Sequence, residues 1–256
     1  MNELIKTTQL AIGYQGHPLI QGIDFRLAKG QICCLLGANG AGKSTFLRTL
    51  LGLQPAISGE IDYFGMSLKQ WSKAELAQKI AYVPQAYHSL FAFSTLDMVL
   101  MGRSPYLKWY QTPSQQDKQI ALQALASLQI EALALRQYTD LSGGEQNLVL
   151  IARAIVQNAA LLIMDEPTSS LDFGNQIRVL EKIEALRSQN RSLILTTHHP
   201  QQADFLVRHF DSIVLLDKTQ SPAFIQGDKS DLLNLEKLAK LYRISPQQLQ
   251  QHIHFH

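Results

Sequence analysis

The sequence predicts an α/β fold with a mostly parallel sheet covered by helices, a small antiparallel β subdomain and an inserted helical subdomain. Three observations indicate this fold. After residue 158, short apolar runs alternate with helical patterns, which is typical of a parallel sheet flanked by helices. Strand-like segments bounded by glycine lie near the N-terminus, and 86–158 shows helical patterns without a convincing strand. We therefore expect a single domain over 1–256, with 1–85 and 159–256 as its core and 86–158 as the insertion.

The N-terminal region contains the segments expected to form the antiparallel sheet. Residues 4–12 and 22–28 have strand-like apolar content and are joined by a turn that contains glycine and proline. Residues 57–65 form another expected strand bounded by glycines. Residues 80–83 are expected to form a strand that ends before Gln85.

The inserted region is expected to be helical. Ser94 resembles the cap of a short helix that stops at Gly102. Thr112-Pro113 gives an N-cap followed by proline at the first helical position, and an apolar stripe over 120–128 continues that helix. A further helix is expected to start at Ser142.

The C-terminal half supplies the alternating elements. The expected strands are 161–165, 193–197, 212–216 and 222–226, and the expected helices are 174–189, 200–208 and short stretches within 229–242.

The composition limits the class of protein. With 46% hydrophobic and 17% charged residues among 256, the chain is expected to be globular and to bury a substantial core. A net charge of +2 without a polybasic run argues against nucleic acid as a partner. The longest apolar stretches, such as 32–36 and 159–164, are too short to span a membrane, and MNELIKTT lacks the apolar core of a signal peptide. Cys33 and Cys34 are neighbours on an expected strand and point to opposite faces, so we expect buried thiols in a cytosolic protein.

The stretch GANGAGKST, residues 37–45, matches the template of a phosphate-binding loop. It lies between the apolar run 32–36 and a helical pattern, which is the strand–loop–helix context that the motif needs. The glycines let the backbone approach the phosphates, Lys43 would reach the β- and γ-phosphates, and Ser44 would offer its hydroxyl to Mg²⁺. The predicted nucleotide-binding residues of this loop are Gly37, Ala38, Asn39, Gly40, Ala41, Gly42, Lys43, Ser44 and Thr45. The chain is therefore expected to bind a nucleoside triphosphate.

Two adjacent carboxylates end the apolar run LLIMDE. Asp165 is expected to help hold Mg²⁺, and Glu166 is expected to polarise the attacking water as general base. An acidic turn after a buried strand would be common in isolation, so both assignments depend on the phosphate loop upstream.

The stretch LSGGE distinguishes this chain from other triphosphate-binding proteins, because two glycines at a helix start would expose N–H groups as a second anion site. The predicted signature residues are Leu141, Ser142, Gly143, Gly144 and Glu145. The chain resembles the ATP-binding-cassette (ABC) family over nearly its whole length. The resemblance rests on LSGGE, the phosphate loop, LLIMDE, the turn 169–172, and Gln85 and His198 after strands. The resemblance implies a P-loop NTPase core of the RecA-like type.

The resemblance also implies how the site works. ABC domains act as head-to-tail homodimers that hold two ATP molecules, so Ser142 and Gly144 of one copy would contact the γ-phosphate held by Lys43 of the other. His198 would sense or orient that phosphate, and Asp172 would shape the opposing site across the dimer.

Two more residues take roles by position in the family. Gln85 would sense Mg²⁺ and the attacking water. Tyr14 would stack on adenine, a contact worth about 1–3 kcal/mol. Each role has an ordinary alternative: Tyr14 as a turn aromatic, Gln85 as the end of a strand, and His198 as a structural histidine.

The chain departs from the family pattern at two places. Glu145 stands where many members have Gln, although Glu also occurs in importers of metal chelates, and Asn147 and Leu148 replace a Gln-Arg pair. Leu148 lies on the apolar face of the expected helix, so this change could concern packing. Three histidines alternate at the C-terminus: His252, His254 and His256. Their side chains could bind a metal, although histidines in such tails are more often unconstrained.

The stretch 94–107, STLDMVLMGRSPYL, resembles importer ATPases for iron–siderophore, haem and cobalamin, and TTHHPQQA resembles molybdate or tungstate importers. The resemblance implies the ATPase subunit of a bacterial importer, with ATP and Mg²⁺ as cofactors, at the cytoplasmic face of the inner membrane. A permease would dock near 86–110, where an apolar helix over 96–101 would expose a patch, and a substrate-binding protein would act indirectly. A soluble non-transport ABC ATPase and an exporter subunit are the alternatives.

Overall fold

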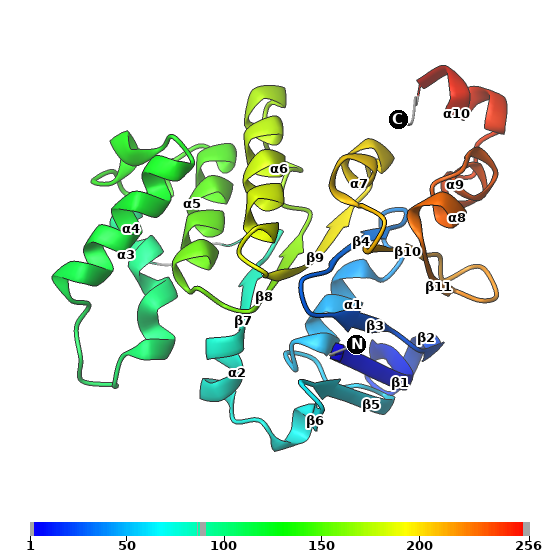
Figure 1. Ribbon diagram of the computed structural model, residues 1–256, viewed down its shortest axis with the longest axis horizontal. Helices are drawn as coiled ribbons and strands as arrows, with labels where there is room; N and C mark the ends of the chain where they lie inside the picture. Colours follow the sequence, from blue (N-terminus) through cyan, green and yellow to red (C-terminus); the bar gives the residue numbers. More distant parts are fainter. Residues whose placement is uncertain (1–2, 86, 88–90, 253–256) are drawn as a thin grey trace. The chain divides into compact units, whose positions relative to one another are not determined.

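The computed structural model in Figure 1 describes residues 3–85, 87 and 91–252. The chain forms two compact units, one made of Met1–Trp71 and Ser192–His256 and the other of Ser72–Arg191. The α/β prediction is confirmed, because a parallel sheet, an antiparallel sheet and helices are all present. In the part of the chain that the structure describes, no helix has the length and hydrophobicity needed to cross a bilayer.

The first unit contains the antiparallel sheet. Its strands are β1 (Glu3–Tyr14), β2 (His17–Ile23), β3 (Arg26–Ala28), β5 (Ser58–Tyr63) and β6 (Met66–Ser67). β1 pairs with β2, β3 and β5, and β6 pairs with β5. Gln15 and Gly16 form the two-residue turn between β1 and β2 and have φ angles of 49° and 80°. Positive φ angles at both residues give a turn whose twist matches that of the two strands.

The expectation of one strand over 22–28 is wrong, because β2 and β3 are separated at Asp24 and Phe25. The hydroxyl of Thr7 on β1 explains the break. It donates to the carbonyl of Ile23 at 2.9 Å and accepts from the backbone N–H of Phe25 at 2.9 Å. The buried side chain therefore bridges the break, beside a backbone hydrogen bond of 2.8 Å from N of Thr7 to the carbonyl of Phe25.

The second sheet of this unit is centred on β4 (Ile32–Leu36). β4 is parallel to β9 (Ser192–Thr197) and β10 (Ser212–Leu216), and β11 (Phe224–Gly227) is antiparallel to β10. Every residue of β4 is buried, as expected for a strand covered on both faces. Its two cysteines are free, and burial raises the pKa of the Cys33 thiol to about 12.

Helix α1 (Lys43–Leu50) is fixed by an aromatic cluster. The ring of Phe46 on α1 contacts the rings of Phe25 and Phe224, with centroids 5.5 Å and 5.2 Å away. The other helical segments of this unit are the 3-10 turn η1 (Leu68–Gln70), α7 (Pro200–Leu206), α8 (Lys229–Leu232), α9 (Leu235–Tyr242) and α10 (Pro246–His252). The sequence did not predict α10, and His254 and His256 lie outside the described residues.

The second unit combines two parallel strands with helices. β7 (Ile80–Val83) pairs in parallel with β8 (Leu161–Asp165). Its helices are α2 (Lys73–Lys79), α3 (Thr95–Leu100), α4 (Gln115–Ser127), α5 (Gly143–Val156) and α6 (Phe173–Arg187), with 3-10 turns η2 (Met101–Tyr106), η3 (Glu131–Leu133) and η4 (Tyr138–Asp140). α3, α4 and α5 pack against one another, as Figure 1 shows in green. Gly102 lets η2 approach α5 closely, because a Cβ there would lie 2.2 Å from the carbonyl oxygen of Arg153.

One expectation about these helices needs correction. α4 is capped by Ser114 and not by Thr112, because Ser114 forms a reciprocal capping box with Asp117. Part of the apolar stretch 96–101 belongs to the core, since Met98, Val99 and Leu100 are buried. Leu96 and Met101 are half-buried.

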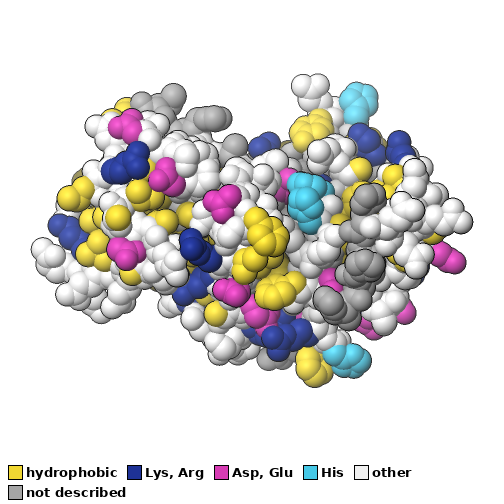
Figure 2. Space-filling view, turned by 90° about the horizontal axis from the view of Figure 1, so that it is seen from above, with side chains coloured by type: hydrophobic (Ala, Val, Ile, Leu, Met, Phe, Trp, Pro, Cys, Tyr) yellow, Lys and Arg dark blue, Asp and Glu magenta, His cyan; other side chains and the backbone are white. Residues whose placement is uncertain are grey.

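The face drawn in Figure 2 shows how charge is distributed. Lys and Arg side chains are interspersed there with Asp and Glu side chains. Among the residues coloured on that face, no continuous basic stripe of the kind that follows a nucleic-acid backbone is present.

Candidate nucleotide site

The predicted phosphate loop connects β4 to α1. Gly40 and Gly42 have φ angles of 73° and 112°, which only glycine adopts without strain. Gly37 is constrained by space, because a Cβ there would lie 2.5 Å from the carbonyl oxygen of Leu216. Ala38, Asn39 and Gly40 are exposed, so their backbone groups are accessible to a ligand. The loop therefore has the backbone conformation that a phosphate cradle requires.

Lys43 is the first residue of α1, and its side chain is held by the loop. It is 5% exposed, and its Nζ donates to the carbonyl oxygens of Gly37 at 2.8 Å and Ala38 at 3.4 Å. The ammonium group thus lies within the turn that the glycines form. A buried cation, the N–H groups of a helix start and the helix dipole all favour an anion at this point.

Tyr14 and Thr45 extend this half of the site. Tyr14 ends β1, is 54% exposed, and its hydroxyl forms a hydrogen bond of 2.7 Å with Oγ1 of Thr45. The ring is therefore held beside the start of α1 with much of its surface accessible. Ser44 is half-buried in the first turn of α1.

His198 lies at the same edge of the sheet as the loop. β9 is parallel to β4, with Thr197 opposite Leu36, so His198 and Gly37 both follow the carboxyl ends of paired strands. His198 is half-buried, and its ring lies 4.0 Å from that of the exposed His199. The hydroxyl of Tyr242 on α9 donates to the backbone carbonyl of His198 at 3.1 Å. Sequence reasoning missed this contact.

The predicted catalytic carboxylate and glutamine meet in the second unit. Gln85 follows β7 and Glu166 follows β8, and the parallel pairing of these strands places both at one edge. Nε2 of Gln85 donates to Oε2 of Glu166 at 3.4 Å. Asp165 and Glu166 are 3% and 8% exposed. Glu166 has a φ of 49°, a left-handed conformation that costs a non-glycine residue about 1–3 kcal/mol and often occurs at functional sites.

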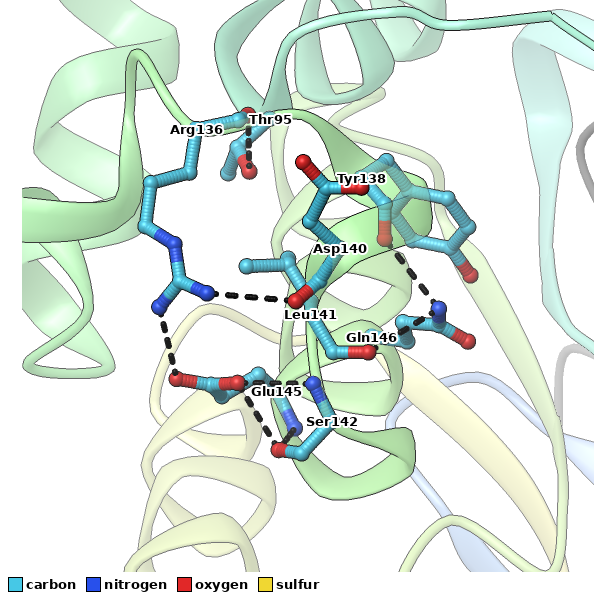
Figure 3. Close-up of polar contacts among 8 residues, drawn as sticks. All are labelled: Thr95, Arg136, Tyr138, Asp140, Leu141, Ser142, Glu145 and Gln146. Atoms are coloured by element: carbon cyan, nitrogen blue, oxygen red, sulfur yellow. Dashed lines mark hydrogen bonds and ion pairs between the residues drawn. The ribbon is translucent and has the colours of Figure 1, made fainter.

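Figure 3 shows the signature segment at the start of α5. Ser142 is the N-cap, and Gly143 and Gly144 form the first turn. Oε2 of Glu145 accepts from both N and Oγ of Ser142, each at 2.8 Å. These hydrogen bonds, from the backbone first, lower the pKa of Glu145 below its ordinary value. Leu141 is buried and anchors the segment, whereas Ser142 and Gly143 are exposed.

Asp172 has a structural role within its own unit. It is the N-cap of α6, accepting from N of Asn175 at 2.9 Å and from its Nδ2 at 2.6 Å. The backbone hydrogen bond of Asn175 is the main cause of the lowered pKa of Asp172. Its predicted role across a dimer stays a prediction.

The departures Asn147 and Leu148 have physical explanations. Leu148 is 3% exposed, and so belongs to the core as expected. Asn147 is 5% exposed, and its Nδ2 donates to the carbonyl of Pro167 at 2.6 Å. This bond connects the signature helix to the residue that follows Glu166. In the sequence, only the position of Asn147 next to the signature indicated that this residue could matter.

The structure thus brings together two groups of predicted residues. Tyr14, the loop 37–45 and His198 belong to the first unit. Gln85, Asp165 and Glu166 belong to the second unit, as do the signature and Asp172.

Comparisons with known proteins agree with these motifs. Residues 20–169 match the family described as ABC transporter. An uncharacterized ABC transporter ATP-binding protein of Haemophilus influenzae is 63% identical, over 99% of this chain and 94% of its own length. The molybdate import ATP-binding protein MolC of the same organism is 40% identical, over 95% of this chain and 90% of its own length.

A solved structure is also similar over nearly the whole chain. It is described as a metal-chelate type ABC transporter in an inward-facing conformation, and it is 39% identical with a TM-score of 0.80. The similarity covers 95% of this chain and 90% of that one. The matching family spans more than half of the chain, and both glycine-rich motifs and the carboxylates lie in the order that an ATP-hydrolysing cassette requires. The chain belongs to the ABC transporter family and is one of its ATP-binding subunits, an ATPase.

Proposed function

We propose that this chain drives the import of a molybdate-type oxyanion, and that a metal chelate such as an iron–siderophore, haem or cobalamin is the second substrate class to test. The observation that carries this proposal is 40% identity to the molybdate import protein over 95% of the chain. The metal-chelate type transporter, at 39% identity, supports the same class of importer.

ATP would bind with its phosphates on the loop 37–45 and its adenine on the exposed ring of Tyr14. Mg²⁺ prefers hard oxygen ligands and keeps several waters, and the chain offers the hydroxyl of Ser44, the carboxylate of Asp165 and the side-chain carbonyl of Gln85. The chemistry of these oxygen donors suits this ion. When bound, the metal would neutralise charge on the phosphates.

Glu166 would act as general base toward the attacking water. Its carboxylate is buried and bonded to Gln85, so a change at Gln85 would alter the orientation of the base. His198 would orient the γ-phosphate from the first unit.

We propose that two copies of the chain bind head to tail through two ATP molecules. The exposed Ser142 and Gly143, and Gly144 beside them, would present N–H groups and a hydroxyl to the γ-phosphate of the partner copy. Neither anion site is complete alone, so ATP itself would join the copies.

A membrane permease would dock near 86–110. A groove of about 420 Å³ lies beside α3 and η2, lined in part by Leu100, Met101 and Leu107. Phe91 is 67% exposed and Trp109 is 95% exposed, which is unusual for such large apolar side chains. The docked chain would lie at the cytoplasmic face of the membrane, and a substrate-binding protein would deliver the cargo to the permease.

Uptake in the native host tests this function. A strain whose chromosomal copy carries Lys43→Ala should lose accumulation of molybdenum from molybdate, or of iron from a chelate, by elemental analysis of washed cells. Lys79→Ala, at the end of α2, is the matched control. If the Lys43→Ala strain accumulates every tested oxyanion and chelate at the control rate, the proposed import function is wrong.

A further inference from the structure

Arg136 connects the start of α3 to the signature segment, as Figure 3 shows. Its backbone carbonyl accepts from N of Thr95 at 2.8 Å and from Oγ1 of Thr95 at 3.1 Å. Thr95 is fully buried and is the first residue of α3. The backbone of Arg136 is therefore fixed at a defined position.

The side chain of Arg136 reaches two groups of the signature segment. Its Nη1 lies 3.7 Å from Oε1 of Glu145, and its Nη2 donates to the carbonyl of Asp140 at 3.1 Å. Glu145 uses its other oxygen, Oε2, for Ser142. The guanidinium and the serine thus bind opposite oxygens of one carboxylate.

This arrangement matters because Ser142 has only one hydroxyl hydrogen. In the structure that hydrogen is donated to Glu145, while the same oxygen accepts from N of Glu145 at 3.3 Å. To bind a phosphate oxygen, the hydroxyl must turn away from a carboxylate that also repels the phosphate. A cation beside Oε1 compensates the negative charge of Glu145 and so reduces the repulsion of the phosphate. It also holds the carboxylate in place when the hydroxyl of Ser142 turns away.

We propose that Arg136 is a positioning residue for the signature serine: by binding Glu145, it allows Ser142 to bind the γ-phosphate of an ATP held by a second copy of the chain. The inference rests on the proposed head-to-tail dimer. It adds a residue outside the five-residue signature to that site. The role is specific to a carboxylate at 145, because a neutral side chain there would need no compensating charge.

A double-mutant cycle tests this role in the full-length chain that carries Glu166→Gln, so that ATP is not consumed. Dimer formation is followed by light scattering during an ATP titration. Arg136→Gln should raise the ATP concentration for half-maximal dimer by roughly three- to tenfold, since exposed ion pairs are worth little singly but two identical sites act together. With Glu145→Gln also present, the same change should have an effect under about twofold.

The control is Arg26→Gln, which removes an exposed ion pair of 2.8 Å between Arg26 and Glu3 in the other unit. It should leave the titration unchanged. Monomer binding of ATP, measured at a protein concentration below that of dimer formation, should be the same for every variant. If Arg136→Gln does not fold, Arg136→Met provides the same cycle, because methionine keeps the apolar part of the side chain but removes the charge that faces Glu145.

Two results overturn the role of Arg136. One is an equal effect of Arg136→Gln with and without the Glu145→Gln substitution, which would mean that Arg136 only supports the backbone at Asp140. The other is no effect in either case. A parent chain that stays monomeric at saturating ATP instead contradicts the dimer itself, and with it the role of Arg136.

Discussion

Replacing Asn147 with alanine should loosen the connection between the signature helix and the segment after Glu166. Nδ2 of Asn147 donates to the carbonyl of Pro167 at 2.6 Å, and Asn147 is 5% exposed. Removal leaves a buried carbonyl without this donor, which costs about 1–3 kcal/mol. For a chain of this size, about 2 kcal/mol corresponds to a fall in melting temperature of about 4–8 °C.

Urea unfolding followed by circular dichroism at 25 °C measures the free energy of unfolding, and a thermal scan measures the melting temperature. Gln123→Ala is the matched control, because it removes an exposed side-chain amide from α4. ATP turnover should also fall for Asn147→Ala, since the residue after the proposed base is less firmly held. If Asn147→Ala and Gln123→Ala have the same urea midpoint and the same melting temperature, the reasoning is refuted, because the buried hydrogen bond would then contribute nothing to stability.

Two further predictions concern other parts of the chain. Tyr14→Ala should weaken binding of ATP to the monomer by about tenfold or more. Tyr14→Phe keeps the ring but loses the hydrogen bond to Thr45, so its affinity for ATP should stay within about threefold of the wild type. A fluorescent ATP analogue measures both affinities, and equal losses would exclude stacking. The pKa of Asp117 is lowered to about 2, first by the hydroxyl of Ser114 and then by Arg103 at 2.8 Å. Because the folded pKa lies below the unfolded one, this carboxylate stabilises the fold above about pH 4 and loses that effect as pH falls toward 2. The difference in unfolding free energy between the wild type and Asp117→Asn should therefore shrink over that range, and a constant difference would contradict the assignment.

Much of this site could be predicted from the sequence because its chemistry depends on short, contiguous motifs. The loop 37–45, LSGGE and LLIMDE each contain their own turn, cap or strand end, so local propensity and function agree there. Gln85 and Glu166 were also proposed as site residues, although 81 positions separate them: Glu166 from the carboxylates that end LLIMDE, and Gln85 from the resemblance to the ABC family.

The features that the sequence did not reveal depend on long-range contacts. The hydroxyl of Thr7 bridges the break between β2 and β3, and it is 16 positions from Ile23. Tyr242 reaches His198 over 44 positions, and the backbone of Arg136, whose side chain pairs with Glu145, accepts a hydrogen bond from Thr95 over 41 positions. No local pattern marks such residues.

Hydrolysis by Glu166→Gln tests the central claim most directly, namely that this chain is an ATPase whose base is Glu166. We predict that ATP turnover falls by about 10²–10⁴-fold while ATP binding is kept, and that ATP then produces a stable dimer. Glu181→Gln, an exposed glutamate on α6, is the control and should hydrolyse ATP normally. If Glu166→Gln hydrolyses ATP as fast as the wild type, Glu166 is not the base and the account of the site is wrong.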